Sequence, residues 1–155
     1  MRDTSPGGRT MESLTIHVED NPCDRDIHMV LEGLLADHAA KGHPRAPMKL
    51  TVFLYDSNNK VLGGLIGSTY WGRLVIEKLW VDEKLRDRGY GERILKAAEK
   101  EAIRRGCRYA HTDTFTWQAL RFYERLGYEQ YAELKDFPKG YSLHYIQKRL
   151  IDDTP

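Results

Sequence analysis

The sequence is poor in cysteine, lacks any long apolar run and carries almost no net charge. Its two cysteines, Cys23 and Cys107, are far apart and form no CxxC pair, so a cysteine-based metal site or redox pair is not expected. No stretch approaches the roughly 20 apolar residues that a membrane-spanning helix needs, and the N-terminus has no apolar segment typical of a secretory signal. These absences predict a cytoplasmic protein that does not enter a membrane.

The small net charge of +1 is unevenly distributed along the chain. Such a balance argues against a general nucleic-acid-binding protein. Between Lys84 and Arg108, however, nine basic and four acidic residues give a local balance of +5, which leaves −4 for the rest of the chain. This concentration has two interpretations: a solvated helix face held by ion pairs, or a binding site for an anionic ligand.

Length and composition predict a single α/β domain. A chain of 155 residues lies within the usual size range of one domain. The first ten residues, MRDTSPGGRT, are polar and contain proline and glycine, so residues 1–12 are expected to form a flexible leader. Residues 13–151 are predicted to form the domain, and residues 152–155 a short tail.

The first third of the chain predicts a strand and a helix. Residues Leu14 to Val18 could form a first strand. A helix should then begin at Asp24, which is placed to cap it, and end at Gly42. Its apolar stripe repeats at spacings of 0, 3, 4, 7 and 8 and consists of Ile27, Val30, Leu31, Leu34 and Leu35.

The remaining chain alternates strands and helices. Three strands with short turns predict an antiparallel meander: Lys49–Tyr55, Val61–Tyr70 and Leu74–Val81. A helix follows between Gly89 and Gly106, with an apolar face of Gly91, Ile94, Leu95, Ala98 and Ala102. The last elements are the strand Tyr109–Thr114, a short helix over Ala119–Leu126, and the strands Tyr128–Leu134 and Tyr141–Leu150. The whole predicts a mixed sheet of about six to seven strands flanked by helices.

The stretch from Val81 to Gly91 carries the clearest functional signal. It joins an apolar strand to a helix, and two glycines, Gly89 and Gly91, stand where side chains would block close approach to the backbone. A helix N-terminus offers unpaired N–H groups and a positive dipole end, which together suit phosphate oxygens. A Rossmann fingerprint would need a third glycine at Ile94, and no Gly-Lys-Ser/Thr loop is present. A phosphate-bearing cofactor of another kind is therefore expected.

Two motifs resemble the GNAT superfamily of acetyltransferases. The family's acyl-CoA signature, Gln/Arg-x-x-Gly-x-Gly/Ala, is matched by Arg86, Gly89 and Gly91. A second element, Phe-Tyr followed by Gly-Phe/Tyr, is matched by residues 122–123 and 127–128 in the family's order and spacing. The resemblance covers residues 14–150. It implies the GNAT fold, acetyl-CoA as cofactor and transfer of an acetyl group to a primary amine through a ternary complex.

The resemblance also implies roles for individual residues. In such enzymes a bulge in the strand before the signature, here around Leu79 to Val81, holds the pantetheine arm and polarises the thioester carbonyl. Tyr123 matches a tyrosine that lies near the departing sulfur, although a packing tyrosine would look the same. The implied cofactor-binding residues are Leu79, Trp80, Val81, Arg86, Asp87, Arg88, Gly89, Tyr90 and Gly91.

The chain departs from the family at two positions. Where histone-type members carry a glutamate base, this chain has Val75, and Glu77 lies two residues further on the same predicted face. Glu77 is the candidate base or amine-binding group, with a salt bridge as the alternative. Thr116 stands where relatives often have an asparagine that touches the cofactor. His111, close to Asp113, could join a proton relay.

The resemblance also implies that aromatic residues line the acceptor pocket. That lining would gather His43, Tyr70, Trp71, Phe115, Trp117, Phe137 and Tyr141. Aromatic faces suit a small amine, although the same residues could form an ordinary core. A small-molecule acceptor is therefore favoured over a protein lysine or N-terminus.

Several further expectations remain open at this point. A non-catalytic acyl-CoA sensor is the alternative to an enzyme, and a homodimer is plausible. No metal is expected, because the N-terminal histidines lack ligand spacing; they are His17, His28, His38 and His43.

Overall fold

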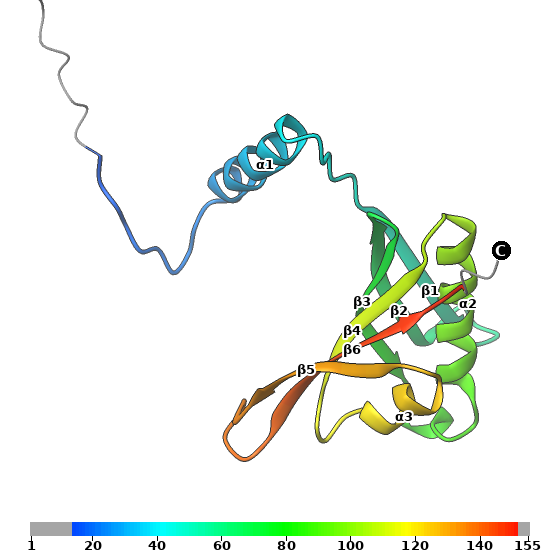
Figure 1. Cartoon of the computed structure of the whole chain (residues 1–155). Helices are drawn as coiled ribbons and strands as arrows, with labels where there is room; N and C mark the ends of the chain where they lie inside the picture. Colours follow the sequence, from blue (N-terminus) through cyan, green and yellow to red (C-terminus); the bar gives the residue numbers. More distant parts are fainter. Residues whose placement is uncertain (1–13, 152–155) are drawn as a thin grey trace, which may run out of the picture. The chain divides into compact units, whose positions relative to one another are not determined.

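The structure, a computed structural model, describes residues 14–151, and the chain divides into two units between Pro44 and Arg45 (Figure 1). The predicted leader, residues 1–12, and the predicted tail, residues 152–155, lie outside the described residues. The boundaries predicted for the domain, 13–151, stay a prediction. None of the helices in the described part is long and apolar enough to cross a membrane.

The first unit contains the helix α1 (Asp24–Ala40). It ends as predicted, because Gly42 adopts a φ of 79° and donates its N–H to the Ala39 carbonyl. The predicted cap is wrong: Cys23 is the N-cap residue, and Asp24 lies in the first turn, where its charge favours the helix dipole. The strand predicted at 14–18 is also wrong. Its alternating apolar residues lie fully exposed, with no neighbouring strand to pair with.

The second unit is built on a six-stranded sheet in the order β1-β2-β3-β4-β6-β5. The first three strands form the predicted antiparallel meander, and β3 pairs in parallel with β4, so the sheet is mixed. This confirms the predicted α/β class. The strands are β1 (Met48–Tyr55), β2 (Val61–Tyr70), β3 (Arg73–Val81), β4 (Tyr109–Phe115), β5 (Glu129–Lys135) and β6 (Ser142–Arg149).

Two helices and one short turn complete the second unit. The helix α2 (Tyr90–Arg104) packs against β1, β2 and β3, and its buried face contains the predicted apolar residues. A single 3-10 turn, η1 (Glu83–Leu85), connects β3 to α2, and α3 (Leu120–Arg125) follows β4. The core between sheet and helices consists of Leu50, Leu65, Leu74, Ile76, Ile94, Leu95, Ala98, Ala102, Cys107, Ala110, Tyr123, Tyr128 and Ile146.

Strand β3 contains one extra residue, Glu77. Its pairing with β2 shifts from Lys78 opposite Ile66 to Ile76 opposite Gly67, which leaves Glu77 without a partner. The family resemblance predicted this bulge around Leu79 to Val81, and that position is wrong by about two residues. The position of a bulge depends on the register of both paired strands, so the sequence of β3 alone could not locate the bulge.

The extra residue reverses the alternation of side chains along β3. The core-facing residues are Leu74 and Ile76 before the bulge and Leu79 and Val81 after it. Gly67 on β2 allows the close approach, since a Cβ atom there would overlap the Val75 carbonyl oxygen. One inserted residue therefore keeps both halves of β3 on the core.

Strands β3 and β4 separate soon after they meet. Their ladder contains three pairs: Arg73 with Tyr109, Leu74 with Ala110, and Val75 with His111. Within the described chain they share no further pairs, so residues 76–81 and 112–115 face each other without a ladder. The hydroxyl of Thr112 donates a 2.9 Å hydrogen bond to the Ile76 carbonyl at the start of this gap. The two strands therefore form an open V.

A charged cluster ties α2 to the last strands. Glu99 on α2 is only 8% exposed. Its carboxylate accepts a 3.0 Å hydrogen bond from the Tyr128 hydroxyl and lies 2.9 Å from Lys148 Nζ on β6. Burial and the neighbouring carboxylate raise the pKa of Tyr128 above its ordinary value. The apolar pattern of α2 did not predict this buried acid.

Replacing Lys148 with methionine should destabilise the protein, because Glu99 would keep its burial and lose its cation. We expect a loss of about 3 kcal/mol in the free energy of unfolding, within the range for broken buried pairs. Chemical denaturation would measure it. Lys96→Met is the matched control, since it removes the partner of Glu92 from an exposed pair on the same helix. Equal stability of the two variants would contradict the buried pair's importance.

Candidate active site

A cleft of about 880 Å³ opens where β3 and β4 separate. Its walls come from the second half of β3, the end of β4, η1, the start of α2, and α3. Of the sequence-predicted catalytic and cofactor-binding residues, all except Arg88 line it. The fold therefore brings one continuous predicted site together.

The outer end of the cleft is the start of α2. Gly89, the N-cap residue, has a φ of 78°, and Asp87 has a φ of 59°. Left-handed residues in such a turn aim backbone N–H groups into an anion-binding concavity, and the first N–H groups of α2 have no partner within the helix. This end of the cleft is suited to phosphate oxygens.

The two glycines of the signature serve different purposes. A Cβ atom on Gly89 would meet nothing within 4 Å, so its positive φ is the constraint. A Cβ atom on Gly91 would lie 3.3 Å from the Phe122 ring. Gly91 therefore lets α2 pack against α3. It also lines the cleft, so the sequence interpretation that both glycines open the backbone to the ligand stays a prediction.

The ion-pair interpretation of the basic segment holds for one part of it, and the anion-site interpretation stays a prediction for the other. Towards the C-terminus of α2, Glu101 pairs with Arg104 and Arg105, and these guanidinium groups lower the pKa of Glu101 to about 2. The opposite end carries Lys84, Arg86, Arg88 and Arg93, which have no carboxylate within 4.0 Å among the described residues.

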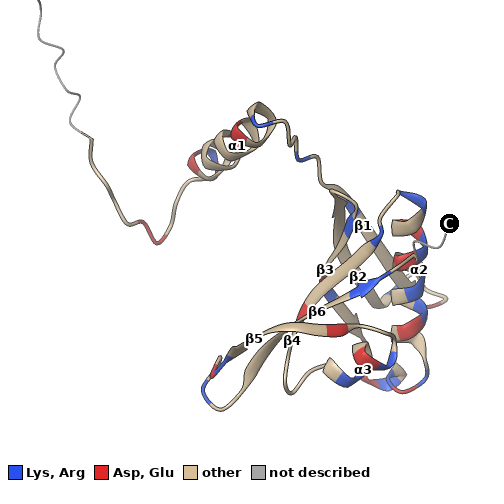
Figure 2. Cartoon of the chain, in the orientation of Figure 1, with Lys and Arg blue, Asp and Glu red and all other residues tan. Residues whose placement is uncertain are grey.

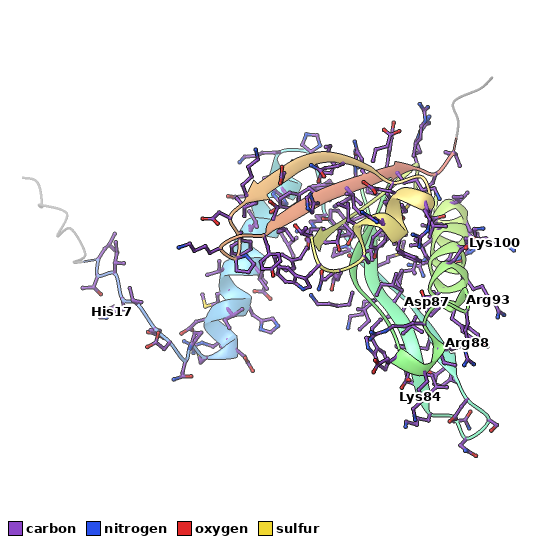
Figure 3. All side chains as sticks on the ribbon, turned by 90° about the horizontal axis from the view of Figure 1, so that it is seen from below. His17, Lys84, Asp87, Arg88, Arg93 and Lys100 are labelled. Carbon is purple, nitrogen blue, oxygen red and sulfur yellow. The ribbon has the colours of Figure 1, made fainter. Side chains whose placement is uncertain are left out.

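The figures show the same division. Charged residues of both signs cover α2 (Figure 2), whereas Lys84, Asp87, Arg88 and Arg93 project from the region where α2 begins (Figure 3). Cations therefore surround the turn at the start of α2, where Arg86 lines the cleft together with the acidic Asp87 and Glu92.

The inner end of the cleft contains a buried phenol. Tyr123 on α3 is 4% exposed and lines the cleft. Burial raises its pKa to about 12, a hydrogen bond with the Thr112 side chain opposes this rise, and the Asp113 charge adds to it. Tyr123 thus keeps its proton at neutral pH. Thr112, which also bridges to β3, is a site residue that sequence reasoning missed, because a threonine in a strand carries no distinguishing signal.

Glu77 lines the same cleft as the unpaired residue of the β3 bulge. Its side chain is exposed, so the burial argument used for it in the sequence does not hold. The alternative salt bridge is absent from the described residues, where no cation lies within 4.0 Å of its carboxylate. Asp113 on β4 also lines the cleft. The inner end therefore has acidic character.

The predicted aromatic lining divides into two groups. Phe115 stacks on Trp117 with ring centroids 4.6 Å apart, and Tyr141 and Phe137 contact this pair at 4.8 and 5.9 Å. We call these four residues the aromatic corner. Phe115 and Trp117 also line the cleft.

The second aromatic group lies elsewhere on the sheet. Tyr70 and Trp71 contact each other at 5.6 Å, and Arg45 covers Tyr70. Tyr70 and Trp71 lie close to Arg73, which pairs with the first residue of β4. Phe115 is the last residue of the same strand. The length of β4 separates the groups by about 20 Å. His43 belongs to the first unit and is not placed relative to either group.

The sequence profile described as Acetyltransferase (GNAT) family matches residues 14–128, more than half of the chain. The chain belongs to the GNAT acetyltransferase family. It is therefore an acyltransferase, and acetyl-CoA is the cofactor that this family uses.

Named relatives support the same assignment. The acetyltransferase Atu2258 of Agrobacterium fabrum is 34% identical over 120 residues, which cover 77% of this chain and 88% of that protein. The blasticidin-S acetyltransferase of Streptomyces morookaense is 37% identical over 92 residues, which cover 59% of this chain and 68% of that protein.

Solved structures share the fold. An acetyltransferase from Bacillus cereus ATCC 14579 superposes with a TM-score of 0.76 at 31% identity, covering 86% of this chain and 97% of that chain. A Bacillus anthracis protein described as a streptothricin acetyltransferase has a TM-score of 0.60 at 20% identity, covering 72% and 68%, and its crystal structure contains acetyl coenzyme A. The likeness to the second protein concerns the fold.

The cleft of this acetyltransferase fits its family's cofactor. The α2 turn and its arginines suit a pyrophosphate. The backbone of residues 79–81 pairs with β2 on one side and faces the gap on the other, so it can bond the amide groups of a pantetheine arm. The cleft thus offers two different surfaces that suit the two chemically different ends of coenzyme A.

Replacing Gly89 with valine should abolish acetyl-CoA binding, because a β-branched residue resists a φ of 78° and would rearrange the turn that presents the N–H groups. The acetyl-CoA-induced rise in melting temperature would measure this. Gly106→Val is the matched control: it introduces the same strain at the other end of α2, at a φ of 83°, away from the cleft. Full binding by Gly89→Val would overturn the phosphate assignment.

Proposed function

We propose that this acetyltransferase transfers an acetyl group from acetyl-CoA to the primary amine of a small molecule, by direct attack within a ternary complex. The V between β3 and β4 supports the proposal, because it joins a phosphate-binding turn at one end to a buried proton donor at the other. Cofactor and acceptor would meet at the inner end, beside Glu77 and Tyr123. The cytoplasmic location and the homodimer expected from the sequence stay predictions.

The proposal gives each part of the cleft a task in holding the cofactor. The backbone N–H groups from Arg86 to Gly91 would bind the pyrophosphate, with Arg86 and Arg88 supplying charge. The open backbone edge of Leu79, Trp80 and Val81 would bind the pantetheine arm. This division agrees with the unpaired cations at the start of α2 and with the missing ladder beyond Val75.

The chemistry at the inner end requires three actions from the protein. Acetyl-CoA supplies an acyl group activated as a thioester. A backbone N–H near Leu79 or Val81 would stabilise negative charge that develops on the carbonyl oxygen. Tyr123 would donate its proton to the departing sulfur, since its raised pKa keeps the phenol protonated at neutral pH. Glu77 would attract the acceptor's ammonium group, or act as its base.

The acceptor is inferred from the aromatic corner and from one relative. Phe115 and Trp117 line the cleft, and the outer members of the corner are about half exposed, so their ring faces can receive an apolar body or a cation. The relative named for blasticidin S acts on a small molecule. We therefore favour a small-molecule amine over a peptide.

The proposal is tested by following free thiol release from acetyl-CoA with a panel of amines. The panel should contain blasticidin S, streptothricin, aminoglycosides, polyamines, arylalkylamines and lysine peptides. We expect release with one class of small-molecule amine, because the aromatic corner discriminates by shape. Release with peptides alone would refute the small-molecule acceptor. No release with any amine, while acetyl-CoA still raises the melting temperature, would refute catalysis of this kind.

Replacing Tyr123 with phenylalanine should preserve acetyl-CoA binding and reduce turnover by about 100-fold, the lower range for loss of a general acid. Steady-state kinetics and the thermal shift would separate the two effects. Tyr128→Phe is the control, since its hydroxyl contacts Glu99 away from the cleft. Unchanged turnover in Tyr123→Phe would remove this residue from the mechanism.

A further inference from the structure

One polar atom beside the cleft is unexplained by the proposed function. His111 on β4 carries a buried ring nitrogen, Nδ1, that has no hydrogen-bond partner among the residues the structure describes. An unsatisfied buried polar group is destabilising, and a catalytic role is one of the explanations for such a group in a native protein. Nδ1 itself is closed to solvent, but the side chain as a whole is only half-buried, so a ligand can approach another part of the ring.

The position of His111 is the closed end of the V. It forms the last ladder pair between β3 and β4, opposite Val75, and the next two residues, Thr112 and Asp113, already line the cleft. Side chains alternate along a strand, so His111 shares a face with Asp113 and not with Thr112. Thr112 and Tyr123 are both buried and both line the cleft, so the phenol and the imidazole lie on opposite faces of the sheet.

The charged and titratable groups around His111 come from three strands. Arg73 lies on β3, Tyr109 and Asp113 share its own strand, and Tyr145 lies on β6. Burial and the Arg73 charge lower the pKa of His111 below its ordinary value, and the Asp113 charge opposes them. At neutral pH the imidazole is therefore uncharged and has a lone pair that can accept a proton.

We propose that His111 is the base that accepts the proton which the acceptor's ammonium group must lose before attack. The inference rests on the proposed function. An N–H bond of the ammonium group breaks, its electron pair stays on the amine nitrogen, and the proton binds an imidazole nitrogen. The imidazolium then releases the proton to water, helped by repulsion from Arg73. Glu77, on the opposite wall, attracts the ammonium group rather than taking its proton.

The reaction moves three protons: the nitrogen loses one before attack and a second as the amide forms, and the sulfur gains one. His111 takes the first, Tyr123 supplies the sulfur, and the Tyr123 phenolate regains its proton from the nitrogen as the intermediate collapses. Tyr123 delivers a proton from the helix-covered side of the sheet, and His111 removes one from the other side. Two groups on opposite faces can each hold the required state from the start.

The test is the pH dependence of kcat/KM with an amine that the wild-type enzyme acetylates. The wild type should lose activity as pH falls and His111 becomes protonated. His111→Gln should lower kcat/KM at pH 7.5 by about 100-fold and lose this acidic limb, while acetyl-CoA still raises its melting temperature. In the wild type, NMR of the His111 imidazole should show a titration that the bound amine perturbs.

Two variants make the test specific. His144→Gln removes another buried histidine, on β6, and should keep the acidic limb. Glu77→Gln should raise KM and also keep the limb. An active His111→Gln with a wild-type pH profile, or loss of the limb in Glu77→Gln instead, would overturn the inference. Failure of the proposed function looks different, since the wild type would then release no thiol with any amine.

Discussion

The site depends on the short ladder between β3 and β4. Three pairs join the strands, and beyond Val75 and His111 their facing backbone groups need other partners. Within the protein, the Thr112 hydroxyl satisfies the first carbonyl of the gap, that of Ile76. At the far end of the gap, Arg86 Nε donates a 3.2 Å hydrogen bond to the Val81 carbonyl, and the edge between these two points faces the cleft. A cofactor with its own amide groups would be a natural partner for such an edge, and under the proposed function the gap in the sheet is also the binding surface.

Charge divides this cleft into two environments. Cations without carboxylate partners gather where α2 begins, whereas Glu77 and Asp113 lie at the inner end, near the Tyr123 phenol. Under the proposed function, an anionic cofactor and a cationic amine would be drawn to different ends of one cleft. Each environment is built by the backbone: the positive φ at Gly89 forms the first, and the bulge at Glu77 exposes an acid in the second.

Local patterns in the sequence predicted the helices and strands well. They predicted poorly the features that depend on two segments far apart in the chain. The α2 stripe, the meander and the signature at Arg86, Gly89 and Gly91 are each readable from neighbouring residues, and the structure has them at the expected places. The position of the bulge requires the register of two strands, and the division of the aromatic residues requires the length of β4. The burial of Glu99 depends on Lys148, far along the chain. The alternating residues 14–18 lacked the partner that would make them a strand.

The single extra residue in β3 has a consequence for how this sequence can change over generations. Because Glu77 resets the alternation, Leu79 and Val81 return to the core after it. Deletion of residue 77 would turn Leu79 and Val81 outward and shift the cleft edge relative to β2. A substitution at this position leaves the alternation of side chains unchanged. A substitution at position 77 therefore changes the chemistry of the cleft without disturbing the core, whereas an insertion or deletion in this strand would disturb it. The fold thus constrains the number of residues in β3 but not the residue type at position 77. That combination would suit a family whose members share one cofactor and use different acceptors.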